Sequence, residues 1–174
     1  MLLYKNRYRL VIYFVFVSFL ISLIPSCADS SVSIDEKHFP DIAFREAVSE
    51  FDANNNGTLS ARELKDLKEL SVARCSNLSG IEYLTSLEEL NVGHAHFTNE
   101  VSFFSDLSIL RLSFTYCTFD SDVNLNGCRV KRIKFDCCKF NSKVDISNCS
   151  SLVSTDFEYW KFLVVLIFLD VQNW

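Results

Sequence analysis

The pattern of apolar and polar residues changes character along the 174-residue chain. Over residues 34–51 the apolar residues recur at helical spacing and predict a helix, and residues 60–67 predict a second, shorter one. The intervening residues are almost all polar and predict a loop. From Leu67 onward, apolar residues alternate with polar ones in short runs, as in strands with one buried face. The pattern predicts an α+β chain, with a helix-loop-helix segment followed by a strand-rich array.

The strand-like runs share one repeating frame. Its first, fourth and sixth positions are mostly apolar, and its ninth is mostly small. Five stretches fit the frame: Leu67 to Cys75, Leu87 to Ala95, Leu107 to Thr115, Val130 to Cys138 and Leu152 to Trp160. Their starts are 20, 20, 23 and 22 residues apart, within the spacing of roughly 20–29 residues that is typical of leucine-rich repeats. We therefore expect residues 67–162 to form a leucine-rich-repeat solenoid with a parallel sheet.

The same frame places polar side chains in rows on the open face of the sheet. Lys68 beside Glu88, and Lys134 beside Asp156, are expected cross-strand ion pairs. This face is either a patterned binding surface or an ordinary solvated surface. One predicted row contains Ser71, Asn91, Arg111, Lys134 and Asp156, and the others contain Lys68, Glu88 and Lys131, and Glu69, Glu89, Ile109 and Arg132.

Residues 52–63 fit every position of the EF-hand calcium loop pattern. A Ca²⁺ ion takes six to eight oxygen ligands, so a short loop must turn sharply to aim several groups at one point. Gly57 permits that turn because it has no Cβ to clash at positive φ. The other interpretation is a solvated turn, but helical patterns flank the loop on both sides. The predicted Ca²⁺ ligands are Asp52, Asn54, Asn56, Thr58, through its backbone carbonyl, Ser60 and Glu63.

The predicted calcium site is weak because only Asp52 and Glu63 bring formal charge. Ligand charge is one of the properties that set Ca²⁺ affinity, so we expect dissociation constants on the order of 10⁻⁴ to 10⁻³ M. Such a site is suited to extracellular calcium concentrations. Ser60 and Glu63 also form a predicted capping box for the second helix.

The N-terminus has the features of a secretory signal over residues 1–26. Basic residues at positions 5, 7 and 9 precede an apolar run from Leu10 to Pro25. The run is short of the roughly 20 residues that span a bilayer, which disfavours a retained signal anchor. Residues 23–27 resemble a bacterial lipobox, which implies lipidation of Cys27 and attachment to the membrane at the cell surface. Residues 27–33 then form a predicted tether.

Charge and cysteine content narrow the range of functions. The chain has a formal charge of −5, and removal of the signal leaves 14 basic and 22 acidic residues, a charge of −8. An acidic chain disfavours nucleic acid as a partner. Six cysteines follow Cys27, without zinc-finger spacing. Cys75 and Cys138 occupy the frame position that favours Asn or Cys, so we expect them to be buried thiols.

No catalytic group is indicated by the sequence, and we expect no enzymatic activity. The chain has no GxSxG motif, and its four glycines leave little scope for a phosphate-binding loop. His94 and His96 have no evident third ligand, so a surface turn is the favoured interpretation over a metal site. The end of the chain, residues 163–174, is either an apolar tail that covers the last repeat or a truncated repeat.

Two stretches carry a family resemblance: Phe39-Pro-Asp-Ile-Ala-Phe44 with the calcium loop, and Leu78-Ser-Gly-Ile-Glu-Tyr-Leu84 with Leu87 to Val92. They resemble secreted leucine-rich-repeat proteins of anaerobic and gut bacteria, which have internalin-like arrays and an EF-hand-like module before the first repeat. The resemblance implies a non-enzymatic surface protein that binds proteins or glycans. The alternative is an accessory or truncated fragment of a larger hydrolytic or adhesion complex, with the loop segment as a dockerin-like module.

Overall fold

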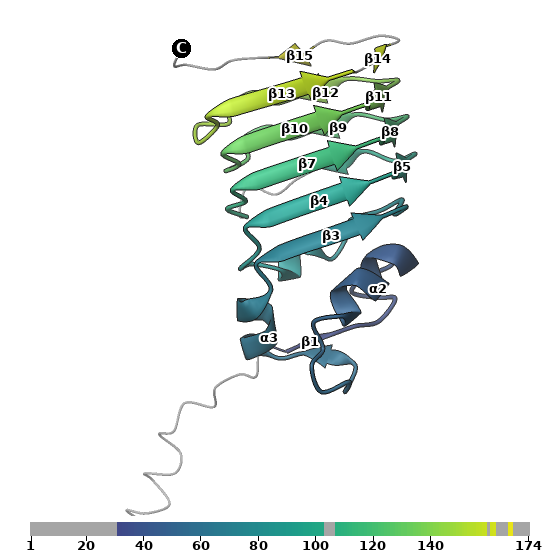
Figure 1. The fold of residues 1–174 in the computed structure, drawn as a ribbon, viewed down its shortest axis with the longest axis vertical. Helices are drawn as coiled ribbons and strands as arrows, with labels where there is room; N and C mark the ends of the chain where they lie inside the picture. Colours follow the sequence, from purple (N-terminus) through teal and green to yellow (C-terminus); the bar gives the residue numbers. More distant parts are fainter. Residues whose placement is uncertain (1–30, 103–106, 160, 163–166, 169–174) are drawn as a thin grey trace, which may run out of the picture. The chain divides into compact units, whose positions relative to one another are not determined.

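Three stacks of parallel strands make up most of the described chain (Figure 1). The computed structural model describes residues 31–102, 107–159, 161–162 and 167–168. The predicted signal peptide, Cys27 and most of the residues 163–174 lie outside these ranges. Within them, no helix has the length and apolar character needed to cross a membrane.

The largest stack is a five-stranded parallel sheet in which each strand contributes one rung. Two four-stranded stacks of two-residue strands complete each turn of the solenoid. The fold is therefore mostly β, with fewer helical residues than the predicted α+β class implied. The large sheet has β3 (Glu69–Ala73), β4 (Glu89–Gly93), β7 (Arg111–Thr115), β10 (Arg132–Asp136) and β13 (Ser154–Glu158). The second stack has β5 (His96–Phe97), β8 (Thr118–Phe119), β11 (Lys139–Phe140) and β14 (Lys161–Phe162). The third stack has β6 (Val101–Ser102), β9 (Val123–Asn124), β12 (Val144–Asp145) and β15 (Ile167–Phe168).

The register of the large sheet corrects the third predicted frame. Leu112 pairs with Leu90, where the predicted frame paired Leu110. The frame therefore starts at Ile109, which is buried, and not at Leu107. Apolar residues at 107, 109, 110 and 112 allow both choices in the sequence. The observed choice brings Phe114 into line with Val92 and Phe135, so that large apolar side chains stack.

The same shift moves two residues on the open face. Ile109 is in the core and not in the exposed row where it was predicted. Arg111 lies beside Glu89, and Ser113 takes the place predicted for Arg111 between Asn91 and Lys134.

Phenylalanine rings fill the core between the large sheet and the second stack. Phe114 stacks on Phe135 with ring centroids 5.3 Å apart, and Phe119 stacks on Phe140 at 5.0 Å. Edge contacts join the two columns, as between Phe114 and Phe119 at 5.3 Å. Each such pair contributes roughly 0.5–1.5 kcal/mol beyond its buried area. The parallel register thus places like rings at the spacing that stacking requires.

Each of the five long strands is followed directly by a residue with left-handed backbone conformation. This conformation is uncommon for residues other than glycine. It turns the chain sharply from the large sheet toward the second stack. Backbone hydrogen bonds to the next rung hold the corner, as in Tyr116 N–H to the Asp136 carbonyl at 2.9 Å. The corner residues are Arg74, His94, Tyr116, Cys137 and Tyr159, with φ between 51° and 62°.

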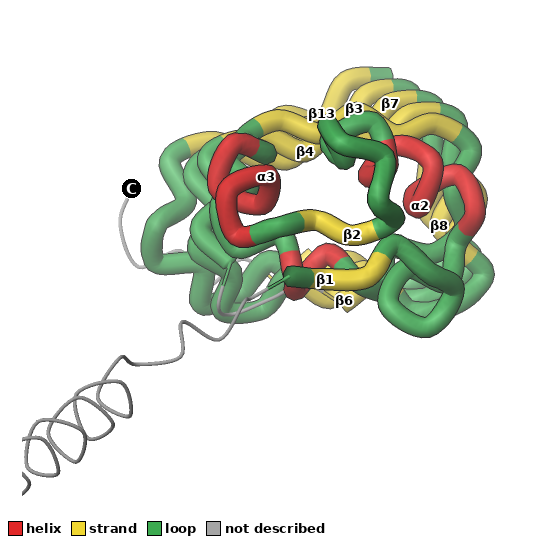
Figure 2. The backbone as a smooth tube through the Cα atoms, turned by 90° about the horizontal axis from the view of Figure 1, so that it is seen from below, coloured by secondary structure: helices red, strands yellow, loops and turns green. Residues whose placement is uncertain are grey.

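The helix-loop-helix segment lies across the end of the solenoid at β3 (Figure 2). It consists of α2 (Ile42–Ser49), β2 (Thr58–Leu59) and α3 (Ala61–Asp66), and β2 pairs antiparallel with β1 (Val32–Ser33), which formed the end of the predicted tether. Its buried residues belong to the same core cluster as those of the first rungs. A 3₁₀ turn at Ile81–Tyr83 follows the first rung.

At Gly80 the first turn of the solenoid packs closely against the residues that precede α2. The φ of Gly80 is +102°, and an added Cβ would lie 2.2 Å from the His38 carbonyl oxygen and 2.6 Å from Cδ1 of Phe39. Both the backbone conformation and the space therefore require glycine.

We expect Gly80→Ala to lower the free energy of unfolding by roughly 2–4 kcal/mol, through backbone strain and overpacking. Gly93→Ala is the matched control, because an added Cβ there meets nothing within 4 Å. In a strand, that exchange is expected to stabilise by about 0.5–1 kcal/mol. Urea denaturation of both variants measures the difference, and equal midpoints would show that the close approach at Gly80 is unimportant.

Candidate metal-binding loop and interaction face

The polar loop between α2 and α3 turns sharply at Gly57, where φ is +77°. Thr58 and Leu59 follow as strand β2. The Leu59 side chain is completely buried, so it faces the core and away from the loop's polar side chains.

Asp52 is oriented by the backbone of its own loop. Its Oδ1 accepts a hydrogen bond from the Asn56 N–H at 3.1 Å, and its Oδ2 accepts one from the Gly57 N–H at 2.7 Å. The residue is only 8% exposed. A carboxylate loses hydration when it is buried, so these two amides compensate part of that cost. The side chain is thus held in one orientation inside the loop.

Glu63 connects the two ends of the loop. Its Oε2 accepts hydrogen bonds from the Ser60 N–H at 2.8 Å and the Ser60 hydroxyl at 2.7 Å, which completes the predicted capping box. Its Oε1 accepts from the Ala53 N–H at 3.0 Å. The hydrogen bonds from the Ser60 side chain and backbone lower the pKa of Glu63. The carboxylate is therefore stabilised in its charged form.

The remaining predicted ligands differ in how firmly they are held. The Asn56 Oδ1 accepts from the Thr58 N–H at 2.9 Å and from its hydroxyl at 2.7 Å. Asn54 is exposed and has no hydrogen bond within the described part of the chain. The structure therefore brings Asn56 to Thr58 and Ser60 to Glu63, while the Asn54 side chain lies free in solvent.

Carboxylates, histidines and cysteines do not gather at this loop in numbers. Within the described ranges, no group of three or more such side chains is placed to hold a metal ion. Any cation in the loop would therefore depend on amide, hydroxyl and carbonyl oxygens in addition to Asp52 and Glu63.

Asp41 links the helix before the loop to the first turn of the solenoid. Its Oδ1 accepts from the Phe44 N–H at 2.9 Å and so caps α2. Its Oδ2 accepts from the Ser76 N–H at 2.7 Å and the Ser76 hydroxyl at 2.9 Å. Burial acts to raise the pKa of Asp41, but the amides of Ser76 and Phe44 and the Ser76 hydroxyl together lower it. One carboxylate thus serves both elements.

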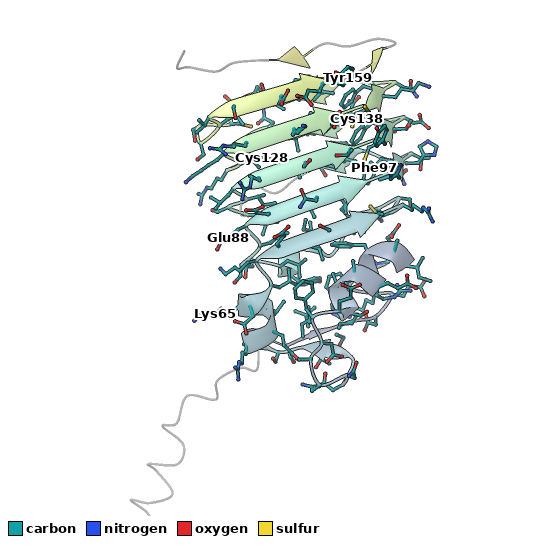
Figure 3. The ribbon with its side chains drawn as sticks, viewed as in Figure 1. Lys65, Glu88, Phe97, Cys128, Cys138 and Tyr159 are labelled. Carbon is teal, nitrogen blue, oxygen red and sulfur yellow. The ribbon has the colours of Figure 1, made fainter. Side chains whose placement is uncertain are left out.

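Ion pairs cross the open face of the large sheet between neighbouring rungs. Lys68 Nζ lies 2.9 Å from Glu88 Oε1, which confirms that predicted pair. Arg111 pairs with Glu89. Lys134 binds Glu158, at 3.0 Å, and not the predicted Asp156. Figure 3 labels Glu88, just before β4, and Tyr159, just after β13. Exposed pairs of this kind contribute little to stability, because water and salt screen their charges.

The six described cysteines are all free thiols, and five of them are buried. Cys75 and Cys138 are among the buried ones, as predicted. With the corrected frame, Cys117 occupies the equivalent place, and the Sγ atoms of Cys117 and Cys138 each contact a carbonyl of the preceding rung at 3.4 Å. Burial raises the pKa of Cys75 and of Cys128 to about 12. These thiols are therefore poor nucleophiles.

The two neighbouring histidines turn to different partners. The His94 ring stacks on Tyr116 with centroids 5.1 Å apart and planes 6° from parallel. The His96 Nε2 lies 2.7 Å from Asp120 Oδ2. One histidine thus packs on an aromatic ring and the other lies beside a carboxylate.

A shallow groove on the open face was not predicted from the sequence. It measures about 310 Å³ and crosses β3, β4 and β7. One sequence feature of this surface is Gly93, a glycine inside a predicted strand, which His94 follows directly. The third frame had to be placed correctly before Ser113 and Thr115 could be assigned to the same surface.

Comparison of the chain with known proteins gives no relative from which a role could be transferred: no family model matches it, and neither does any curated protein.

We expect the stabilising contribution of Asp41 to depend on pH. Its pKa is lowered in the folded chain from the ordinary value of 3.8. The contribution is therefore fully present above 3.8 and is lost as the pH falls through the lowered value. Asp41→Asn should cost roughly 1 kcal/mol at pH 7, with allowance for solvent screening. The difference from the wild-type chain should vanish at low pH.

Urea denaturation between pH 7 and pH 2 tests this expectation. Glu46→Gln is the matched control, because Glu46 is an exposed carboxylate on the same helix. A wild-type advantage over Asp41→Asn that stayed constant down to pH 2 would contradict the assignment.

Proposed function

We propose that this protein is an exported, calcium-stabilised repeat protein that binds a protein or glycan at the cell surface. In this proposal, the loop Asp52–Glu63 is an EF-hand-like Ca²⁺ site and the solenoid is of the leucine-rich-repeat class. The open face of the large sheet makes the contacts. A lipid on Cys27 holds the chain at the membrane.

The observation that carries the calcium proposal is the arrangement of Asp52. A largely buried carboxylate, with each oxygen on an amide of the same loop, is a preorganised cation ligand. Each carboxylate oxygen has room for about two hydrogen bonds or ligands. Asp52 uses one per oxygen, so it retains capacity for a cation. A bound Ca²⁺ would offset the cost of burying this charge.

The other five ligands fit the chemistry of a hard cation. Ca²⁺ takes carboxylate, amide, hydroxyl and carbonyl oxygens, often with water among them. Glu63 at position twelve already joins the start of the loop to the start of α3. The remaining members of the ligand set are Asn54, Asn56, Thr58 and Ser60.

The proposed role of the ion is to hold the end of the solenoid in place. The loop joins α2 to α3, and α2 is attached to the first turn through Asp41 and Ser76. Phe39 packs in the core beside Gly80. These fixed contacts favour a structural cap over a detachable dockerin-like module.

Support for the leucine-rich-repeat class comes from the spacing of the rungs. With the corrected third frame, the repeats start at residues 67, 87, 109, 130 and 152. All intervals then lie at 20–22 residues, within the range for that class. Repeat solenoids present extended surfaces, which suits a binding function.

We expect Ca²⁺ to raise the thermal unfolding midpoint of the purified chain. For a dissociation constant near 10⁻³ M, 10 mM Ca²⁺ would stabilise the fold by about 1.4 kcal/mol. Asn54→Asp should increase this effect, because it adds a carboxylate at a predicted ligand position. Asn55→Asp adds the same charge to the neighbouring residue, which is not a predicted ligand, and should leave the effect near the wild-type value.

Thermal melting with and without Ca²⁺ gives the comparison. An unchanged wild-type midpoint in 10 mM Ca²⁺ would refute the calcium site. Equal gains for the two aspartate variants would reduce the effect to general electrostatic attraction.

A further inference from the structure

The residues at the corners after the long strands form a ladder on the surface. His94, Tyr116, Cys137 and Tyr159 come from successive rungs, and all have the same left-handed conformation, with φ between 51° and 55°. Equal backbone conformations direct the side chains of neighbouring corners the same way. The His94 ring accordingly stacks on the Tyr116 ring, with centroids 5.1 Å apart and planes 6° from parallel. One step of this ladder is therefore about the distance between two rungs.

The ladder lacks a ring at Cys137. Tyr116 and Tyr159 stand one rung to either side of it. A ladder continued at 5.1 Å per step places the two tyrosine rings roughly 10 Å apart. A flat group halfway between them would lie about 5 Å from each ring centroid, within the roughly 6 Å over which an aromatic face attracts a cation. The thiol is shorter than a ring, so it fills only the base of this gap.

Both tyrosines are open to solvent. Tyr116 is 57% exposed and Tyr159 is 85% exposed. Tyr159 lies just beyond the end of β13 (Figure 3). At this exposure its ring is not held by neighbours and can turn against a ligand. Aromatic side chains are enriched in protein interfaces relative to the rest of the surface.

Two carboxylates lie beside the gap. Asp136 and Glu158 are the last residues of β10 and β13 and directly precede Cys137 and Tyr159. Burial raises the pKa of the Cys137 thiol, and its hydrogen bond to Asp136 and the charge of Glu158 raise it further, against a hydrogen bond with Tyr116 that lowers it. Both carboxylates thus act on the position in the gap, and their field there favours a positive charge.

The chain's own cations leave Asp136 without an ion pair in the described residues. Lys134 is engaged with a glutamate of the next rung at 3.0 Å. Arg132 lies at the other end of β10, about 13 Å away along the strand. Lys139 lies beyond the corner, where its charge acts on Asp120. The charge of Asp136 is therefore available to a cation from outside the chain.

We propose that the gap over Cys137 binds an arginine side chain of a partner protein, with its guanidinium between the rings of Tyr116 and Tyr159 and paired with Asp136. A guanidinium is planar, stacks on aromatic faces and matches a carboxylate with two parallel hydrogen bonds. An ammonium has the charge without the plane, and a neutral or acidic sugar has no cation to offer. Tyrosine and arginine are also among the residues enriched at the energetic centres of protein interfaces.

This inference rests on the proposed binding function, for which it names a protein as the partner, but it does not depend on the calcium site. The calcium test can fail while an arginine peptide binds, and the peptide can fail to bind a chain that calcium stabilises.

The test is a titration of the full chain with the blocked peptide Gly-Gly-Arg-Gly-Gly at constant calcium, followed by the NMR signals of the tyrosine rings. A site for one side chain should have a dissociation constant on the order of 10⁻³ M. Citrulline in place of arginine keeps the planar group and removes the charge, so we expect binding at least about tenfold weaker. Lysine keeps the charge and removes the plane, and should bind several-fold more weakly.

A pair of variants at Cys137 tests the gap itself. Cys137→Tyr places a ring in the gap and should abolish binding. The corner conformation already accepts tyrosine at positions 116 and 159, and an unchanged melting temperature would show that this variant folds. Cys137→Ser is the matched control, because it leaves the gap open and should bind the peptide as the wild-type chain does.

Two further variants test the walls and the charge. Tyr159→Leu should weaken binding several-fold through loss of one aromatic face. Asp136→Asn should weaken it about tenfold. Glu50→Gln is the control for the lost charge, because Glu50 is an exposed carboxylate at the end of α2 and should leave the affinity unchanged.

Other results would overturn the proposal. Equal affinity for the arginine and citrulline peptides would exclude a role for charge, and equal affinity for arginine and lysine would exclude stacking. Unchanged binding by Cys137→Tyr would place the peptide elsewhere. Shifts of the same tyrosine signals with an oligosaccharide alone would identify a glycan as the occupant. Self-association that Arg74→Gln abolishes would identify a second copy of this chain, and absence of shifts with every probe would refute the site.

Discussion

The in-register hydrogen bonding between parallel rungs is the constraint on which the rest of the structure depends. Parallel strands lie about 4.8 Å apart, so each side chain lies directly beside its counterpart in the next repeat. Apolar positions then build continuous columns, of which the stacked phenylalanines are the clearest case. The same rule applies outside the core, where neighbouring rungs must alternate in charge or leave like charges side by side. Arg111 beside Arg132 is such a place.

The end of such a stack needs a covering, and the helix-loop-helix segment supplies it here. Parallel rungs expose unpaired backbone groups and apolar side chains at the first strand. The core residues Phe39, Phe44 and Leu59 cover the apolar part at this end. Polar contacts fix the covering in place, and Asp41 has the central position because it caps α2 and binds Ser76 with the same carboxylate. Asp41 thereby attaches α2, the helix that leads into the loop, to the first turn of the solenoid.

Much of this arrangement could be predicted from the sequence, because short-range patterns carried it. The capping box of Ser60 and Glu63, the buried thiols and four of the five frames follow from spacing alone. The third frame could not be chosen, because apolar residues at both 110 and 112 satisfied the pattern and only cross-rung packing of Phe114 decides between them. The two short stacks were also missed, since a two-residue strand leaves almost no periodic signal. The groove combines residues from three rungs and depends on the correct frame.

The repeated left-handed corner has a consequence for how such a molecule can change in length. A left-handed residue follows each long strand, and the amides of the first four of these corners bond to the rung above. One complete turn is therefore a geometrically interchangeable unit. Duplication of a segment of about 22 residues would extend the face by one rung and preserve the register on either side, whereas gain or loss of a single residue within a long strand would turn the following side chains inside out.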